Sequence, residues 1–162
     1  MQQNDTTTTA DVLLDLTIPG QPCGQPRARA RLAMVPDRRG RVRPVPVMHR
    51  ARSGPSARWE DAASWGFREA WAGRSPLDEP LVLEVTALFA RPKRLLWKQR
   101  PTPRQPQWGR PDADNVLKAV ADALQRAGVL RDDGIISCVT VWKLYAAGDE
   151  GPGVRVVLSR IE

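Results

Sequence analysis

Four aspartates flank a short apolar segment in the second half of the chain, and they are the residues best suited to chemistry. Asp112 and Asp114 precede the segment, Asp132 and Asp133 follow it, and Lys118 lies inside it. Grouped carboxylates repel one another unless a cation is bound among them. Oxygen ligands without histidine or cysteine suit Mg²⁺ or Mn²⁺, and such ions promote phosphodiester hydrolysis. The pattern therefore predicts a divalent-metal site.

The segment between the two acidic pairs is predicted to be a helix. Its apolar face consists of Val116, Val120, Ala123, Leu124 and Ala127, and Gly128 follows as a C-terminal stop. Pro111 favours extended chain before the helix, which would leave Asp112 and Asp114 on one side of that chain. Asp114 or Asn115 would then cap the helix. Lys118 would follow one turn after Asp114, on the same side.

The second acidic pair comes just before a β-rich run at residues 135–142. Neighbouring residues at the start of a strand face opposite sides, so at most one of Asp132 and Asp133 can join the first pair. The sequence is compatible with a strand that returns to the first pair and with one that does not. Ordinary structural roles also exist, since D-x-D-N often caps a helix, D-D-G often forms a turn, and a helix lysine is often only solvated.

Taken together, these residues stand in a fixed order that resembles a known family, the RusA-type Holliday-junction resolvases, especially the branch found in phages and prophages. The matching residues are Pro111-Asp112-Ala113-Asp114-Asn115, Lys118, Asp122-Ala123-Leu124, Gly128-Val129, Asp132-Asp133 and Lys143. Asp133 follows Asp114 by 19 residues, as expected for the family. Several elements at fixed offsets are far more specific than D-x-D alone.

The resemblance implies roles for individual residues. Asp112, Asp114 and Asp133 would hold Mg²⁺, with Mn²⁺ able to substitute, and Lys118 would assist cleavage at the scissile phosphate. Asp132 and Asn115 would lie beside these residues without binding the ion directly. The resemblance also implies a homodimer that cuts two symmetry-related strands of a four-way junction, in recombination and repair.

Composition supports a nucleic-acid partner. The 162 residues carry 25 bases and 18 acids, a net charge of +7, which favours a polyanion. The absence of a long apolar run and of a signal-peptide pattern predicts a soluble, cytoplasmic protein with no membrane partner. Cys23 and Cys138 have no C-x-x-C partner, so we expect free thiols, and His49 lies far from the acids in an arginine-rich stretch.

Two basic stretches are candidate DNA contacts. Arg27, Arg29 and Arg31 alternate, so they would share one side of a hairpin whose tip is at residues 37–40, and they would lie across phosphates. A solvated basic loop is the alternative. Residues 91–110 form a basic, proline-interrupted loop in which Trp97 and Trp108 could stack on unpaired bases or, alternatively, could anchor a flexible loop to the core. Arg110 at its end and Lys143 on the last part of the motif complete the predicted DNA-binding residues.

The remaining elements predict an α+β fold. Residues 1–10 are polar and predicted to be disordered, and residues 11–162 would form one RusA-like endonuclease domain. We expect strands at residues 12–18, 81–90, 135–142 and 154–161, and an amphipathic helix at residues 58–71. Trp65 is expected to pack in a broad core face of this helix, and a contact with a partner subunit is the alternative. A mixed sheet of about four to five strands with two helices on one face would result.

The predicted function is a Mg²⁺-dependent endodeoxyribonuclease that resolves Holliday junctions. One alternative is a non-catalytic junction- or RNA-binding module whose acids only cap a helix. Another is a metal-dependent phosphatase or nuclease that acts on unbranched substrates.

Overall fold

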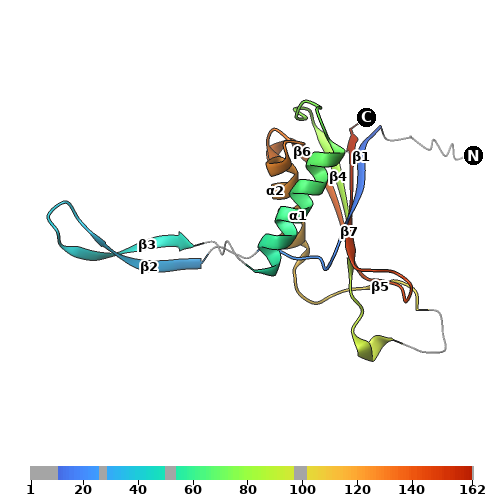
Figure 1. Cartoon of the computed structure of the whole chain (residues 1–162), viewed down its shortest axis with the longest axis horizontal. Helices are drawn as coiled ribbons and strands as arrows, with labels where there is room; N and C mark the ends of the chain where they lie inside the picture. Colours follow the sequence, from blue (N-terminus) through green and yellow to red (C-terminus); the bar gives the residue numbers. More distant parts are fainter. Residues whose placement is uncertain (1–10, 26–28, 50–53, 97–101, 162) are drawn as a thin grey trace, which may run out of the picture.

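The computed structural model describes residues 11–25, 29–49, 54–96 and 102–161, with the backbone alone described at residues 29–31, 48 and 49. Its main sheet contains β1 (Val12–Pro19), β4 (Leu81–Phe89), β5 (Gln105–Pro106), β6 (Ile136–Tyr145) and β7 (Gly153–Arg160), in the order β1-β7-β4-β6-β5. β4 and β6 run parallel and the other neighbours antiparallel. The helices α1 (Pro55–Ala70) and α2 (Ala113–Ala127) lie on one side of this sheet (Figure 1). The predicted α+β class, with two helices on one face of a mixed sheet, is confirmed.

The core lies between the sheet and the two helices. Alternate residues of β4 are buried, from Leu81 through Phe89, because successive side chains of a strand face opposite sides. The helices contribute Trp59, Ala63, Phe67, Val116, Val120 and Leu124 to the same cluster. Complete burial of a large apolar side chain stabilises the fold by about 1.5–3 kcal/mol. This layer therefore fixes α2, and with it the residues at both ends of α2.

α1 begins at Pro55, three residues before the predicted start, because proline suits the first turn of a helix. Its buried side is narrow: Trp59, Ala63 and Phe67 follow one another at four-residue spacing. The prediction that Trp65 packs in the core is wrong, since its side chain is 66% exposed. Trp65 lies two residues from both Ala63 and Phe67, which turns it away from the sheet.

A separate two-stranded sheet, β2 (Arg29–Pro36) paired with β3 (Val42–His49), confirms the predicted hairpin. We call these two strands and their turn the ribbon. Its turn is closed by the Asp37 N–H, which donates to the Arg41 carbonyl at 2.9 Å, and Gly40 adopts a φ of 73° that favours glycine. The Asp37 carboxylate accepts the backbone N–H groups of Arg39 and Arg41 at 2.8 and 3.0 Å. The predicted tip at residues 37–40 is therefore confirmed.

Other predictions concern the termini and thiols. The described residues contain no helix long and apolar enough to cross a membrane. Cys23 and Cys138 are free thiols, as expected, and burial raises the pKa of the Cys23 thiol. The prediction for residues 1–10 falls outside the described part of the chain.

Candidate metal centre

The first acidic pair lies at the start of α2. Asp112 occupies the N-cap position with extended backbone angles, φ −69° and ψ 156°, and Asp114 lies in the first helical turn. The predictions that Asp114 or Asn115 caps the helix, and that both aspartates lie on extended chain, are therefore wrong. Proline restricts the residue before it and not the residues after it, so Pro111 leaves the helix free to begin at Ala113.

Both carboxylates of this pair are exposed and available. The Asp112 side chain makes no capping hydrogen bond, and neither Asp112 nor Asp114 forms an ion pair within the described residues. The first N–H groups of the helix give this end a partial positive charge that stabilises nearby anions. Two oxygen ligands that the fold does not use are thus presented at one place.

A loop that follows β1 holds this end of α2 in position. The Gln25 N–H donates to the Asn115 carbonyl at 3.0 Å. A Cβ atom added to Gly24 would lie 2.5 Å from Cβ of Pro111 and 3.1 Å from Cβ of Asn115. Only a residue without a side chain allows so close an approach. The predicted site residue Asn115 is therefore half-buried against this loop and contacts it through its backbone.

Lys118 lies one turn after Asp114, as predicted, and its side chain is 58% exposed. Its Nζ atom is 3.8 Å from Oδ1 of Asp122, one turn further along the helix. The buried side chain of Gln25 donates from Nε2 to Oδ2 of the same carboxylate. Asp122 therefore links Lys118 to the loop that holds the helix start.

Sequence reasoning did not assign a role to Gln25 or Asp122. The D-A-L part of the motif contains Asp122 and was the only available signal. Gln25 stands 97 residues away in the sequence from the carboxylate it contacts, in a stretch with no periodic pattern.

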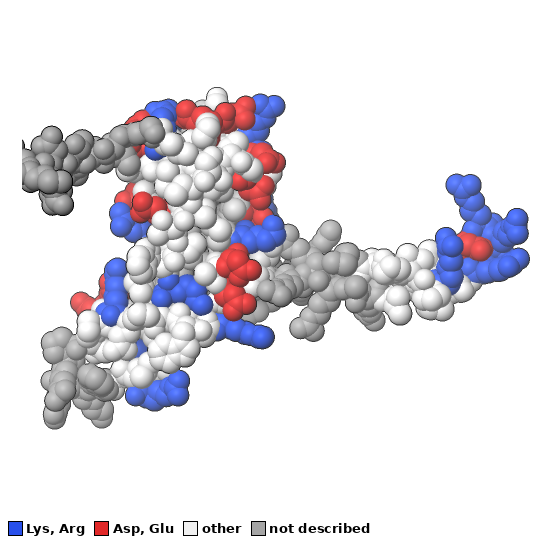
Figure 2. Space-filling view, turned by 180° about the vertical axis from the view of Figure 1, so that it is seen from behind, with Lys and Arg blue, Asp and Glu red and all other residues white. Residues whose placement is uncertain are grey.

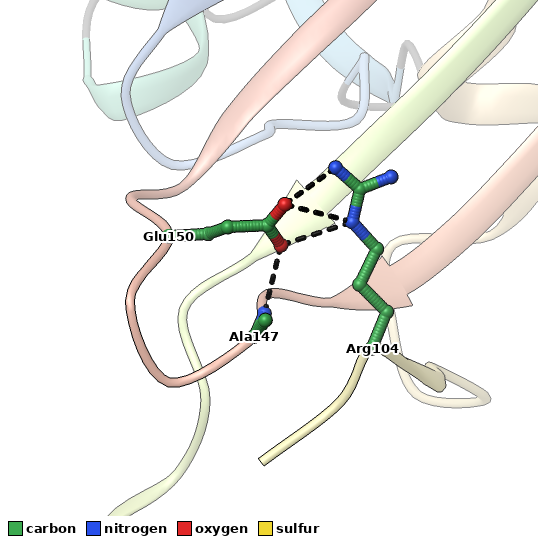
Figure 3. Close-up of polar contacts among 3 residues, drawn as sticks. All are labelled: Arg104, Ala147 and Glu150. Atoms are coloured by element: carbon green, nitrogen blue, oxygen red, sulfur yellow. Dashed lines mark hydrogen bonds and ion pairs between the residues drawn. The ribbon is translucent and has the colours of Figure 1, made fainter. Parts of the chain in front are cut away.

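The segment before Asp112 is also anchored. The Lys143 Nζ atom donates to the Gly109 carbonyl at 2.7 Å, and the Gln107 N–H donates to the Lys143 carbonyl at 2.9 Å. Further back, Arg104 forms a forked ion pair with Glu150 at distances of 2.5 to 3.0 Å (Figure 3). This guanidinium, helped by the Ala147 N–H, lowers the pKa of the Glu150 carboxyl to about 2. Lys143, which was predicted to bind DNA, contacts the protein's own backbone here.

The second acidic pair lies at η2 (Asp133–Ile135), between α2 and β6. Oδ1 of Asp132 accepts the Gly134 N–H at 2.8 Å, which is the turn-forming role that D-D-G often has. Asp133 is exposed, and no hydrogen bond or ion pair of its side chain is found within the described residues.

The two acidic pairs lie at opposite ends of α2. The helix has 15 residues, which corresponds to about 22 Å. β6 then runs back along it, from Ile136 next to η2 to Lys143, whose side chain reaches Gly109 near the helix start. Within the described residues, no three His, Cys, Asp or Glu side chains are grouped so as to hold a metal ion. One chain therefore brings together Asp112, Asp114 and Lys118, and it does not bring Asp133 to them.

The residues at the start of α2 nevertheless fit a hard divalent ion. Mg²⁺ is commonly held by one or two carboxylates together with water and substrate phosphate oxygens. Asp112 and Asp114 supply two carboxylates without nitrogen or sulfur ligands beside them, and they are open to solvent. The donor set is therefore compatible with Mg²⁺ or Mn²⁺.

The other predicted DNA-binding residues are distributed over two regions. Arg29 and Arg31 lie on β2, where they pair with His49 and Val47, and Arg27 lies outside the described residues. Arg110 is exposed two residues before Asp112, and Trp108 beside it is 84% exposed.

Comparison with known proteins gives two findings. A family model described as endodeoxyribonuclease RusA matches residues 19–159. Crossover junction endodeoxyribonuclease RusA of Aquifex aeolicus (strain VF5) is 26% identical over 98 residues. That alignment covers 60% of this chain and 64% of the Aquifex protein, so the chain matches somewhat less than two thirds of that relative's length.

Proposed function

The chain belongs to the RusA endodeoxyribonuclease family, and from this premise we propose that it resolves Holliday junctions and related branched DNA by Mg²⁺-dependent phosphodiester hydrolysis. The observation that carries the proposal is the exposed pair Asp112 and Asp114 at the start of α2, with Lys118 one turn further on. The name of the Aquifex relative, a crossover junction endodeoxyribonuclease, supports the same substrate.

The proposed roles follow from side-chain chemistry. Asp112 and Asp114 bind the divalent ion, which supplies the activation of water at neutral pH and the neutralisation of transition-state charge. Lys118 places a positive charge near the scissile phosphate, where it stabilises developing negative charge. The Asp122 carboxylate contacts the side chains of both Lys118 and Gln25, so Asp122 and Gln25 position Lys118 for this role.

We also propose a homodimer, because a four-way junction presents two symmetry-related strands for paired cleavage. The position of Asp133 supports the homodimer. Asp133 lies at the far end of α2 from Asp114, so if it binds the same ion it must come from a second copy of the chain. Each copy would then complete the metal centre of the other.

The first test uses a synthetic four-way junction labelled on each strand, with a linear duplex of the same sequence as the competitor. With Mg²⁺ or Mn²⁺ the protein is expected to cut two opposed junction strands and to leave the duplex intact. Asp114→Asn should bind the junction without cutting it, whereas the matched control Asp149→Asn, at an exposed turn, should cut normally. An intact junction in the presence of metal would contradict the nuclease, and metal-independent binding alone would favour a binding module.

A second test mixes two inactive variants, Asp114→Asn and Asp133→Asn. If copies share their centres, a mixed dimer contains one centre with both carboxylates and one with neither, so nicking of a single strand should return. If each chain holds its own ion, every centre in the mixture lacks one carboxylate and no cleavage returns. The latter result would refute the shared centre and leave the nuclease proposal standing.

A further inference from the structure

The ribbon is an isolated structure. β2 and β3 pair with each other over eight residues and join no other strand, and Figure 1 shows them extending away from the main sheet. A two-stranded hairpin without a packing partner is only marginally stable in water. A long projecting ribbon therefore calls for a ligand that it contacts.

Proline positions disfavour an added strand along β3 as this ligand. The Asp37 N–H donates to the Arg41 carbonyl across the turn. Counting from this pair, every second pair of facing residues in β2 and β3 exchanges backbone hydrogen bonds. Pro36, Pro44 and Pro46 occupy the intervening positions, whose backbone nitrogens face outward. Proline has no N–H, so the outer edge of β3 lacks two successive donors that an added strand would need, whereas the outer edge of β2 lacks one, at Pro36.

One face of the ribbon is apolar. It carries Leu32, Met34, Pro36, Val42, Pro44 and Pro46, all exposed. Eight residues of strand extend about 26 Å, and two strands are roughly 10 Å wide with their side chains, so two such faces would bury roughly 500 Å² together. A stable protein interface needs about 1,000 Å² or more. The face alone is too small to hold two copies together.

The tip of the ribbon is strongly basic. Arg38, Arg39, Arg41 and Arg43 lie within six residues, and all four are exposed. Asp37 is the single acid, and its carboxylate accepts backbone N–H groups of the turn. Figure 2 shows these bases gathered at the far end of the ribbon.

Five arginines of the main body differ from those at the tip in being paired with acids. Arg126 pairs with Asp61 at 2.7 Å and Arg131 with Asp78 at 2.5 Å. Arg104, Arg155 and Arg160 are likewise paired with acids. No ion pair to the four tip arginines occurs among the described residues. Unpaired, exposed guanidinium groups are the ones that can neutralise phosphates.

We propose that the ribbon is a DNA-binding arm, whose four tip arginines contact the phosphates of a duplex segment away from Asp112 and Asp114. The proposal rests on the proposed function in taking DNA as the ligand. The major groove, about 12 Å wide, admits a two-stranded ribbon. The tip thus holds one arm of a branched substrate while the acidic residues act at the branch.

The test measures duplex affinity without divalent metal as a function of salt, so that it does not depend on cleavage. Arg38→Gln/Arg39→Gln should reduce the slope of log K against log salt by about 1.8, since each phosphate contact contributes about 0.9. The matched control Arg126→Gln/Arg131→Gln removes the same charge where acids already pair with it, and its slope should stay at the wild-type value. Unfolding temperatures of all variants verify folding.

Two results would overturn the proposal. One is a salt slope for Arg38→Gln/Arg39→Gln equal to that of the wild type. The other is an equal reduction of the salt slope in the control Arg126→Gln/Arg131→Gln, which would indicate that net charge alone sets the slope. Leu32→Ser/Met34→Ser addresses the competing ligand, a second copy. If this variant changes the oligomeric mass while the tip variant keeps the wild-type slope, the ribbon joins two copies and does not bind DNA. Loss of slope at the tip with no junction cleavage would support the arm and reject the nuclease.

Discussion

Gly24 provides a direct perturbation of the candidate metal centre, because the loop that contains it touches the start of α2. A Cβ atom at this position would lie 2.5 Å from Cβ of Pro111, whereas ordinary van der Waals contact begins at about 3.4 Å. Gly24→Ala must therefore displace the segment that carries Asp112 by nearly 1 Å, or break the Gln25 to Asn115 hydrogen bond.

The expected size of the effect follows from the contact. Overpacking of this kind costs about 1–3 kcal/mol, which corresponds to about 2–12 °C in unfolding temperature for a domain of this size. A displacement of about 1 Å at a reacting group can reduce the rate about 100-fold. We therefore expect Gly24→Ala to lower the cleavage rate far more than it lowers junction affinity.

The assays are thermal unfolding and single-turnover junction cleavage at saturating protein. Gly151→Ala is the matched control, because a Cβ atom there meets nothing within 4 Å and no positive φ is required. Gly24→Ala with wild-type unfolding temperature and wild-type cleavage would refute the argument that the loop positions the aspartates. An equal effect in Gly151→Ala would show that the assay reports general damage.

Three further predictions concern contacts around the site. Gln25→Leu removes the donor to the Asp122 carboxylate, so it should cost about 1–3 kcal/mol of stability and reduce cleavage; unchanged values of both would contradict this role. Asp132→Ala should lower the unfolding temperature through loss of its turn hydrogen bond yet retain cleavage that Asp133→Asn loses, and equal loss of cleavage in both would contradict that division. Arg104 lowers the pKa of the Glu150 carboxyl from 4.5 to about 2, so its stabilisation is complete above pH 4.5 and is lost as the pH falls toward 2. The acid-induced fall in unfolding temperature should be smaller in Glu150→Gln, and an unchanged fall would contradict the ion pair.

The sequence predicted those elements whose periodicity reports burial. β4 alternates and α2 repeats at helical spacing, because one side of each packs in the core. The ribbon was predicted as a hairpin with its tip at residues 37–40, and Asp37 and Gly40 close the turn there. The start of α2 was misplaced, since proline at 111 was taken to extend the chain after it as well as before it.

The candidate site was only partly predictable. Asp114 and Lys118 are four residues apart, so helical geometry alone places them on one side, and Asp112 lies at the N-cap just before them. Gln25 and Asp133 depend on how distant segments pack, and spacing along the chain carries no information about that. The sequence left open whether the strand returns to the first pair; β6 does return, but Asp133 precedes it, so the strand brings Lys143 and not Asp133 near the helix start.

The same loop connects the ribbon and the metal centre. Gly24 and Gln25 contact Pro111, Asn115 and Asp122, and β2 begins four residues after Gln25. This loop therefore contacts the start of α2 and precedes the proposed DNA arm in the chain. Substitutions at the ribbon tip should change affinity alone, because they leave this segment intact. Substitutions within the loop, such as Gly24→Ala, should lower cleavage far more than affinity, because they move the aspartates and leave the tip arginines unchanged.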